Sequence, residues 1–175
     1  MAFFEGFLGQ HTHSVDEKGR VAVPNSFRRK LSPACEGRLI LLRGRDRTIE
    51  VHPLSDWDEF VNRTLRKLPL YQPKAQRILR YRYASATEVG LDGQGRILLP
   101  KHLREESGID NEAVLAGAGD YFEIWNPGRL QAFLREAGET YDADLVELER
   151  QGWGGIPDDD NGSAGKGVPP AGDGQ

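Results

Sequence analysis

The sequence predicts an α+β protein built from two similar halves. A D-x-x-G-R-x-x-x-P-x-x-x-R motif occurs twice, beginning at Asp16 and again at Asp92. Short β-type and helical segments also alternate in the same order around each copy. Five motif positions are identical without a gap, and the three residues after the first Arg are apolar in both copies. Two copies are too few for a solenoid, so we expect one pseudo-symmetric domain.

Each motif predicts a tight turn between two strands, followed by a short helix. Asp at the first turn position and Gly at the fourth favour a type I turn, and a Gly with positive φ suits a bulged hairpin. The expected strands are 11–15 and 20–23 in the first copy, and 84–91 and 96–99 in the second. A proline ends each second strand and starts a helix, over 25–31 and 101–107. The structural residues of the motif are therefore Asp16, Gly19, Pro24, Asp92, Gly95 and Pro100.

The remaining segments predict a second hairpin in each copy and several helices. The hairpins are expected at 38–43 with 48–52, and at 113–117 with 121–125. Ser55, a capping residue with an acid three positions on, predicts a helix over 55–68, and further helices are expected over 73–83, from 127 and over 141–150. The expected organisation is an extension (1–6), a first repeat (7–56), linking helices (57–83), a second repeat (84–132), a C-terminal helical segment (133–150) and a disordered Gly-rich tail (151–175).

Composition excludes several classes of protein. One cysteine, Cys35, permits no internal disulfide and no cysteine-based metal cluster, which fits a cytoplasmic setting. No apolar run approaches the roughly 20 residues of a membrane span, so we expect no membrane partner. We find no nucleophile–base pattern, phosphate-binding Gly loop or paired carboxylates. The chain is therefore expected not to be an enzyme, and to have neither cofactor nor small-molecule substrate.

Arg20 and Arg96 are the strongest candidates for binding DNA. Each follows a tight turn, where a side chain can project from a sheet, and Arg binds both guanine edges and phosphate. The equally weighted alternative is an ion pair between Asp16 and Arg20 across the turn. Lys18 lies within the first turn and can reach a phosphate, whereas the second turn has Gln94 at that position.

The last arginines of the two motifs, Arg28 and Arg104, are further candidate DNA contacts. Arg28 is followed by two more cations and Arg104 by two glutamates, so we expect the first copy to carry more phosphate affinity.

Two other groups have ambiguous readings. Residues 61–87 hold seven Lys or Arg and no Asp or Glu, although the whole chain has a net charge of −4. This run is a solvated helix face, a DNA contact, or a partner for the acidic 136–149 segment of a neighbouring subunit. His11 and His13 share a strand face, but no third ligand is near, so we expect no metal site. A metal-dependent enzyme built on these two histidines is the least favoured reading.

At this point the residues resemble a known family. The segment H-T-H-S-V-D-E-K-G-R-V-A-V-P-N-S-F-R at 11–28 resembles the first signature of the bacterial MraZ family, and L-D-G-Q-G-R-I-L-L-P-K-H-L-R at 91–104 resembles its second. The segment G-D-Y-F-E-I-W-N-P at 119–127 is also similar to that family. The resemblance covers roughly residues 7–149, and two signatures at this separation are far more specific than one.

The resemblance implies a fold, a partner and an assembly. The fold would be the AbrB/SpoVT-like double-split, swapped-hairpin β-barrel with interleaved halves and flanking helices. The function would be transcriptional regulation by a ring-shaped homo-oligomer that binds short tandem DNA repeats upstream of the division and cell-wall gene cluster, in the cytoplasm at the nucleoid. Lys18, Arg20 and Arg96 match the DNA-contacting positions of the signatures. The alternative is a ring-forming scaffold whose main partner is a protein.

Overall fold

The computed structural model describes residues 6–153 of the chain. The described residues form two compact units, one that ends at Leu134 and one that begins at Arg135. Most of the expected N-terminal extension (1–6) and of the expected disordered tail (151–175) lies outside the described residues. Among the described helices, none is long and apolar enough to cross a membrane.

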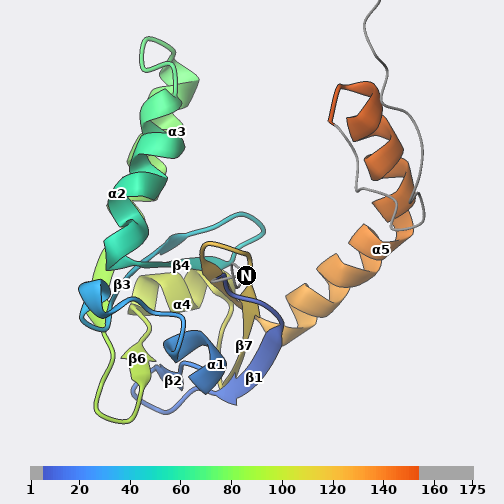
Figure 1. The fold of residues 1–175 in the computed structure, drawn as a ribbon. Helices are drawn as coiled ribbons and strands as arrows, with labels where there is room; N and C mark the ends of the chain where they lie inside the picture. The colour runs from blue at the N-terminus through green and yellow to red at the C-terminus, as the bar shows by residue number, and fades with distance from the viewer. Residues whose placement is uncertain (1–5, 154–175) are drawn as a thin grey trace, which may run out of the picture. The chain divides into compact units, whose positions relative to one another are not determined.

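Each motif copy contributes four strands and one α-helix, in the same order (Figure 1). The first copy contains β1 (Gln10–Ser14), β2 (Arg20–Ala22), α1 (Asn25–Arg28), the 3-10 turn η1 (Pro33–Cys35), β3 (Arg38–Arg43) and β4 (Ile49–Pro53). The second contains β5 (Thr87–Gly90), β6 (Arg96–Leu98), α4 (Lys101–Ser107), β7 (Glu112–Gly117) and β8 (Phe122–Trp125). The linking helices are α2 (Leu54–Arg63), η2 (Leu65–Lys67) and α3 (Pro73–Ser85), and α5 (Pro127–Arg150) follows β8.

The two copies exchange strands, which confirms the swapped-hairpin α+β fold. The six-stranded antiparallel sheet has the order β1-β7-β8-β4-β3-β5, so each copy's first strand pairs with the other copy's second hairpin. β2 and β6 form a separate antiparallel ribbon. Within residues 6–153 the strand pairing does not close into a ring. The order is the same when read from either end with the copies exchanged, and Glu50 faces Glu123 at its centre.

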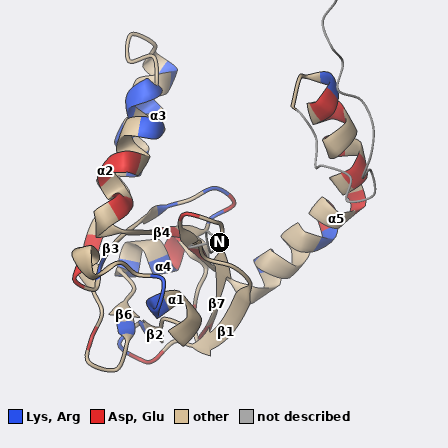
Figure 2. Cartoon of the chain, in the orientation of Figure 1, with Lys and Arg blue, Asp and Glu red and all other residues tan. Residues whose placement is uncertain are grey.

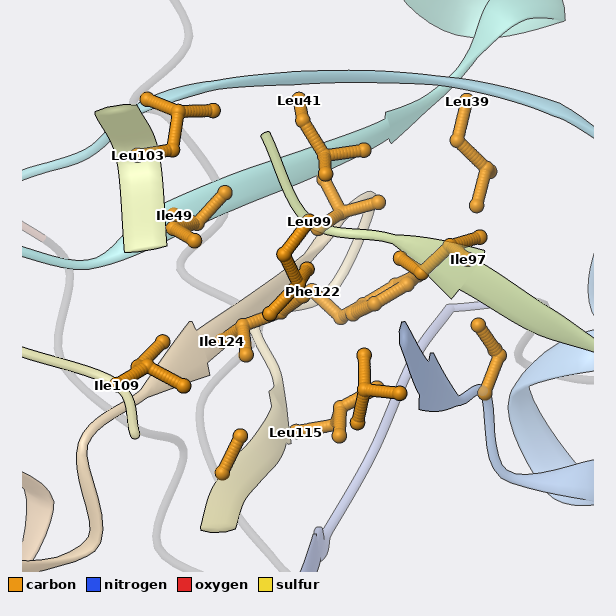
Figure 3. Close-up of a cluster of buried hydrophobic side chains, with 14 of the residues drawn as sticks. Leu39, Leu41, Ile49, Ile97, Leu99, Leu103, Ile109, Leu115, Phe122 and Ile124 are labelled. Carbon is orange, nitrogen blue, oxygen red and sulfur yellow. The ribbon is translucent and has the colours of Figure 1, made fainter. Parts of the chain in front are cut away.

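One hydrophobic core serves both copies (Figure 3). It takes Leu39, Leu41 and Ile49 from the first copy and Leu115 and Phe122 from the second, all fully buried. The inner face of the ribbon and the two short helices close it, through Val21, Phe27, Ile97 and Leu103. Because these side chains interdigitate, neither copy has a complete core of its own, and burial of each large side chain contributes roughly 1.5–3 kcal/mol to the shared unit.

Three helix predictions were wrong in their limits. Ser55 does not cap α2: the helix begins at Leu54, its N-cap is Pro53, and Ser55 Oγ donates to Asp56 instead. The expected helix over 55–68 breaks after Arg63 into the short η2. The helix expected over 25–31 ends at Arg28, and the two helices expected after residue 126 are one helix, α5, because no residue between 127 and 150 interrupts the backbone hydrogen bonding.

A buried polar cluster attaches α3 to the sheet. Glu50, on β4, is ion-paired with Arg82 of α3, whose Nη1 donates to Glu50 Oε1 at 3.1 Å. His52 Nε2 lies 3.2 Å from Glu50 Oε2, and the His52 ring stacks on Tyr121. Burial would raise the pKa of Glu50, but the hydrogen bonds with His52 and Arg82 and their charges outweigh it and lower that pKa. Glu50 is therefore a buried carboxylate that stays charged because of these partners.

Candidate nucleic-acid interface

The β2–β6 ribbon presents the two candidate arginines on one surface. Val21 pairs with Ile97 at the centre of the ribbon, and both side chains are buried in the core. Alternation along a strand then places the neighbouring side chains on the opposite face, which carries Arg20, Ala22, Arg96 and Leu98. Leu98 is 52% exposed, so this outer face is open to solvent.

The turn before each ribbon strand is built by an aspartate. Asp16 Oδ1 accepts hydrogen bonds from the backbone N–H groups of Lys18 and Arg20, at 3.0 and 2.9 Å. The Gly19 N–H closes the turn onto the Asp16 carbonyl, and Gly19 has a φ of +82°. Asp92 makes the equivalent bonds to Gln94 and Arg96. Asp provides the acceptors and Gly the left-handed backbone, as this turn requires.

The same aspartates also hold the two arginine side chains. Arg20 Nε donates to Asp16 Oδ2 at 2.7 Å, and Arg96 Nε donates to Asp92 Oδ2 at 2.9 Å. Arg96 Nη1 also lies 3.8 Å from Asp16 Oδ2, so one carboxylate is near both arginines. Bonds from the Arg96 side chain and backbone lower the pKa of Asp92 to about 2. Those from Arg20, its backbone N–H first, lower the pKa of Asp16.

The ion pair between Asp16 and Arg20, expected as the alternative to DNA contact, is therefore present in the structure. The ion pair and a DNA contact by Arg20 are nevertheless compatible. Arg20 uses Nε for Asp16, and its two Nη groups donate no hydrogen bond to the described residues. A guanidinium held through Nε still presents Nη donors outward. The aspartate therefore orients the arginine on the outer face of the ribbon.

The exchange of strands moves Arg28 and Arg104 to the opposite copy's turn. A Cβ built on Gly19 would lie 2.8 Å from Nη1 of Arg104, and one built on Gly95 would lie 2.7 Å from Cζ of Arg28. Each guanidinium thus covers the turn glycine of the other copy. Neither side chain makes a hydrogen bond or ion pair among the described residues.

This placement redistributes the charge that the sequence assigns to the first copy. Lys18 is exposed at the tip of the first turn, and Arg104 is its neighbour. Arg28 instead lies beside the second turn, where Gln94 stands in place of a lysine. Each end of the ribbon therefore has one cation from a helix, Arg104 of α4 at the first turn and Arg28 of α1 at the second. Figure 2 shows blue segments on α1 and on the ribbon strand β6. Sequence reasoning missed this exchange, because the spacing of nine residues from Gly to Arg is the same in both copies and does not show which copy's turn each arginine covers.

The predicted site residues thus gather around one ribbon. Lys18, Arg20, Arg28, Arg96 and Arg104 all lie on the ribbon or at its turns. A hollow of about 430 Å³ beside the first turn is lined by one cation, Arg104, and by an excess of acids: Asp16, Glu17, Glu105 and Asp110. That hollow is unsuited to phosphate, so the outer ribbon face is the cationic surface here.

His11 and His13 are the two histidines of β1, and His11 contacts neighbouring side chains of the fold. His11 Nε2 lies 3.2 Å from Ser26 Oγ, and its ring meets the edge of Phe27. Burial and the neighbouring His11 lower the pKa of His13. In residues 6–153 no group of three or more His, Cys, Asp or Glu side chains is arranged to hold a metal ion.

Comparison with known proteins gives this arrangement a family. The model of the MraZ protein family matches residues 7–81 and 83–147, which is most of the chain. The chain belongs to the MraZ family. Both signature motifs and nearly all of the linking and flanking helices fall within the matched residues, so the MraZ resemblance noted in the sequence is confirmed.

Several relatives in the MraZ family are named transcriptional regulator MraZ. The protein of Herpetosiphon aurantiacus is 44% identical over 128 residues, which cover 73% of this chain and 86% of the relative. That of Desulfitobacterium hafniense is 40% identical over 135 residues, 77% of this chain and 91% of the relative. That of Moorella thermoacetica is 36% identical over 137 residues, 78% and 92% of the two chains.

Proposed function

We propose that this MraZ family member is a transcriptional regulator, not an enzyme, and that its β2–β6 ribbon binds duplex DNA. The observation that carries the proposal is the outward pair Arg20 and Arg96, held by Asp16 and Asp92 in positions related by a pseudo-two-fold axis. The name shared by the relatives supports the same function. A two-stranded ribbon fits the major groove of B-DNA, where guanine offers two acceptors to an arginine.

The residues around the ribbon divide the work. Arg20 and Arg96 contact base edges, because they lie on the outer face near its centre. Lys18, Arg28 and Arg104 lie at the turns and contact phosphates, which positions the ribbon along the groove. The pseudo-two-fold relation of the two turns matches the local two-fold symmetry of the backbone on either side of a base step.

One ribbon provides few contacts, so affinity is built by repetition. The chain assembles as a ring-shaped homo-oligomer, and successive ribbons bind short tandem repeats upstream of the division and cell-wall gene cluster, at the nucleoid in the cytoplasm. Linking several weak contacts raises avidity by about 10²–10⁴-fold where the geometry permits. The near-neutral charge of the chain favours this over strong non-specific binding by one subunit.

The assignment is tested by Arg20→Ala, with Arg45→Ala as the control. Arg45 is an exposed arginine in the loop between β3 and β4, so its loss changes the net charge equally. Loss of a bidentate base contact costs about 1–3 kcal/mol, which is about fivefold to 150-fold in affinity. We expect this loss for Arg20→Ala at both of two salt concentrations in a footprint over the upstream DNA, with the salt dependence unchanged, because the lost contact is to a base and not to a phosphate.

A second candidate function follows from the ion pairs themselves. If the Asp16–Arg20 pair serves a subunit contact, the chain is a ring-forming scaffold for a protein partner. Arg20→Ala would then lower the molar mass measured by light scattering. A folded, fully assembled Arg20→Ala protein with unchanged footprints would contradict the DNA-binding assignment of this residue.

A further inference from the structure

One surface of α3 combines exposed aromatic and basic side chains. Lys74, Arg77, Ile78 and Tyr81 follow the i, i+3, i+4, i+7 spacing of one helix face, and Tyr71 lies in the turn just before the helix. Tyr71 is 83% exposed and Tyr81 60% exposed. We call these five residues the α3 face. An exposed row of large apolar groups is typical of an interaction surface.

The α3 face is also positively charged. Residues 61–87 contain no Asp or Glu, and Lys74 and Arg77 have no ion-pair partner among the described residues. Arg43 lies over the ring of Tyr81, but its charge is balanced by Glu106. The charge of the face therefore comes from Lys74 and Arg77, which are free to meet an acidic partner.

The C-terminal unit carries a surface of opposite charge. Ala137, Tyr141, Leu145 and Leu148 follow one another at spacings of four, four and three along α5, which places them on one side of the helix. Tyr141 and Leu148 are exposed. We call these four residues the α5 stripe. Helical spacing puts three acids along its edges: Asp142, Asp144 and Glu149.

We propose that the α5 stripe of one copy docks on the α3 face of a second copy. The proposal deepens, and rests on, the homo-oligomeric assembly proposed above. From Lys74 to Tyr81 and from Tyr141 to Leu148 the helices each advance seven residues, about 10 Å, so the two surfaces match in length. Aromatic and aliphatic side chains meet their like, and Lys74 and Arg77 meet the acidic edges.

A helix fits the α3 face better than DNA does. Phosphates would pair with the two cations, but they would leave Tyr71, Ile78 and Tyr81 without an apolar partner. Each chain has one α3 face and one α5 stripe, so the contact is head-to-tail. Such a contact continues from copy to copy and closes into a ring when the rotation permits.

The test is a charge exchange between two variants. Lys74→Glu with Arg77→Glu reverses the α3 face, and Asp144→Lys with Glu149→Lys reverses the edges of the α5 stripe. Each variant alone is expected to raise the midpoint concentration for assembly at least about tenfold, because attraction becomes repulsion. An equimolar mixture is expected to assemble again, since each reversed surface then meets a complementary one. Light scattering across a dilution series measures both effects.

Matched controls separate the two surfaces from charge in general. Arg66→Glu with Lys67→Glu makes the same charge change in η2, outside the α3 face. Glu136→Lys with Glu139→Lys makes the same change on α5 away from the stripe. Both controls are expected to assemble like the natural protein.

Crosslinking identifies which chain supplies the helix. Arg77→Cys in one tagged chain and Asp144→Cys in a differently tagged chain are expected to form an inter-chain disulfide; the natural Cys35 is buried and does not compete. A third variant carries both cysteines in one chain. A disulfide that forms within this chain, with none between the two singly substituted chains, would overturn the proposal.

Other results overturn it in distinguishable ways. If the natural protein assembles and the reversed variants assemble equally well, the docking assignment is wrong while the proposed assembly stands. If reversed variants assemble normally but lose DNA affinity, the α3 face binds DNA instead. A natural protein that stays monomeric at every concentration defeats the assembly itself, and the Arg20 footprint then judges the DNA-binding proposal on its own.

Discussion

Replacing Gly95 by alanine tests the turn and the exchanged arginine together. Gly95 has a φ of +73°, a left-handed conformation that costs an L-residue roughly 1–2 kcal/mol. The new Cβ would also lie 2.7 Å from Cζ of Arg28. That contact is with the far end of a flexible side chain, so it moves the guanidinium and adds little to the loss of stability. We therefore expect Gly95→Ala to lower the free energy of unfolding by about 1–2 kcal/mol.

Gly93 is the control, because it lies in the same turn without either constraint. Its φ is not in the left-handed region, and nothing lies within 4 Å of a Cβ built on it. Gly→Ala at such a position is neutral or stabilises by about 0.4–1 kcal/mol, through the unfolded chain. Urea unfolding of the two variants, followed by circular dichroism, gives the comparison. Equal stabilities for Gly93→Ala and Gly95→Ala would refute this account of the turn.

The displaced guanidinium adds a functional consequence. If Arg28 contacts phosphate, Gly95→Ala lowers the affinity for DNA. In a protein that already carries Arg28→Ala, adding Gly95→Ala is expected to cause no further loss of affinity. A footprint titration of the two single variants and the double variant measures this coupling. Additive losses would show that Arg28 is not displaced by the new methyl group.

Two further predictions concern buried and paired charges. Arg82→Ala leaves Glu50 buried without its cation and is expected to lower the free energy of unfolding by about 3–5 kcal/mol, measured with urea. The control Arg63→Ala removes an exposed i,i+4 pair, whose arginine side chain is 64% exposed, and is expected to lower it by about 0.5 kcal/mol or less. Similar losses for the two variants would contradict the stabilising role of the buried pair. The pKa of Asp92 falls from 3.8 to about 2 on folding, so the stability that its ionised form contributes is present above about pH 4 and is lost as pH falls toward 2. The Asp92→Asn protein should therefore lose less stability than the natural protein between about pH 5 and pH 2.5. Identical losses would show that the Asp92–Arg96 pair is not responsible.

Local features of the fold follow from neighbouring residues and could be predicted. Asp16 and Gly19 act within one turn, through bonds that span at most four residues. Pro24 and Pro100 each precede a helix directly, because proline cannot continue the strand pairing and its φ suits a helix start. Asn126 caps α5, accepting the N–H of Arg129. The Ser55 error has a local cause too, since Pro53 is already the N-cap of α2 and the helix begins at Leu54, one residue before Ser55.

Partners distant in sequence could not be predicted from the same signals. The strands 11–15 and 20–23 read as a hairpin, yet they share one bridge, between Val15 and Val21, and pair instead with β7 and β6. Both copies have nearly the same apolar pattern, so local preference does not distinguish pairing within a copy from pairing between copies. The family resemblance, not the periodicity, supplied the exchange.

The amino-acid sequence specified where the chain turns, which residues shape those turns, and which arginines stand next to them, because these depend on backbone geometry over a few residues. Only the tertiary structure determined which turn the side chains of Arg28 and Arg104 each cover. Arg28 covers Gly95, and Arg104 covers Gly19, because sharing one core between two copies buries more apolar surface than two separate small cores could. The twice-repeated motif thus becomes one two-sided ribbon, with each end built from both copies.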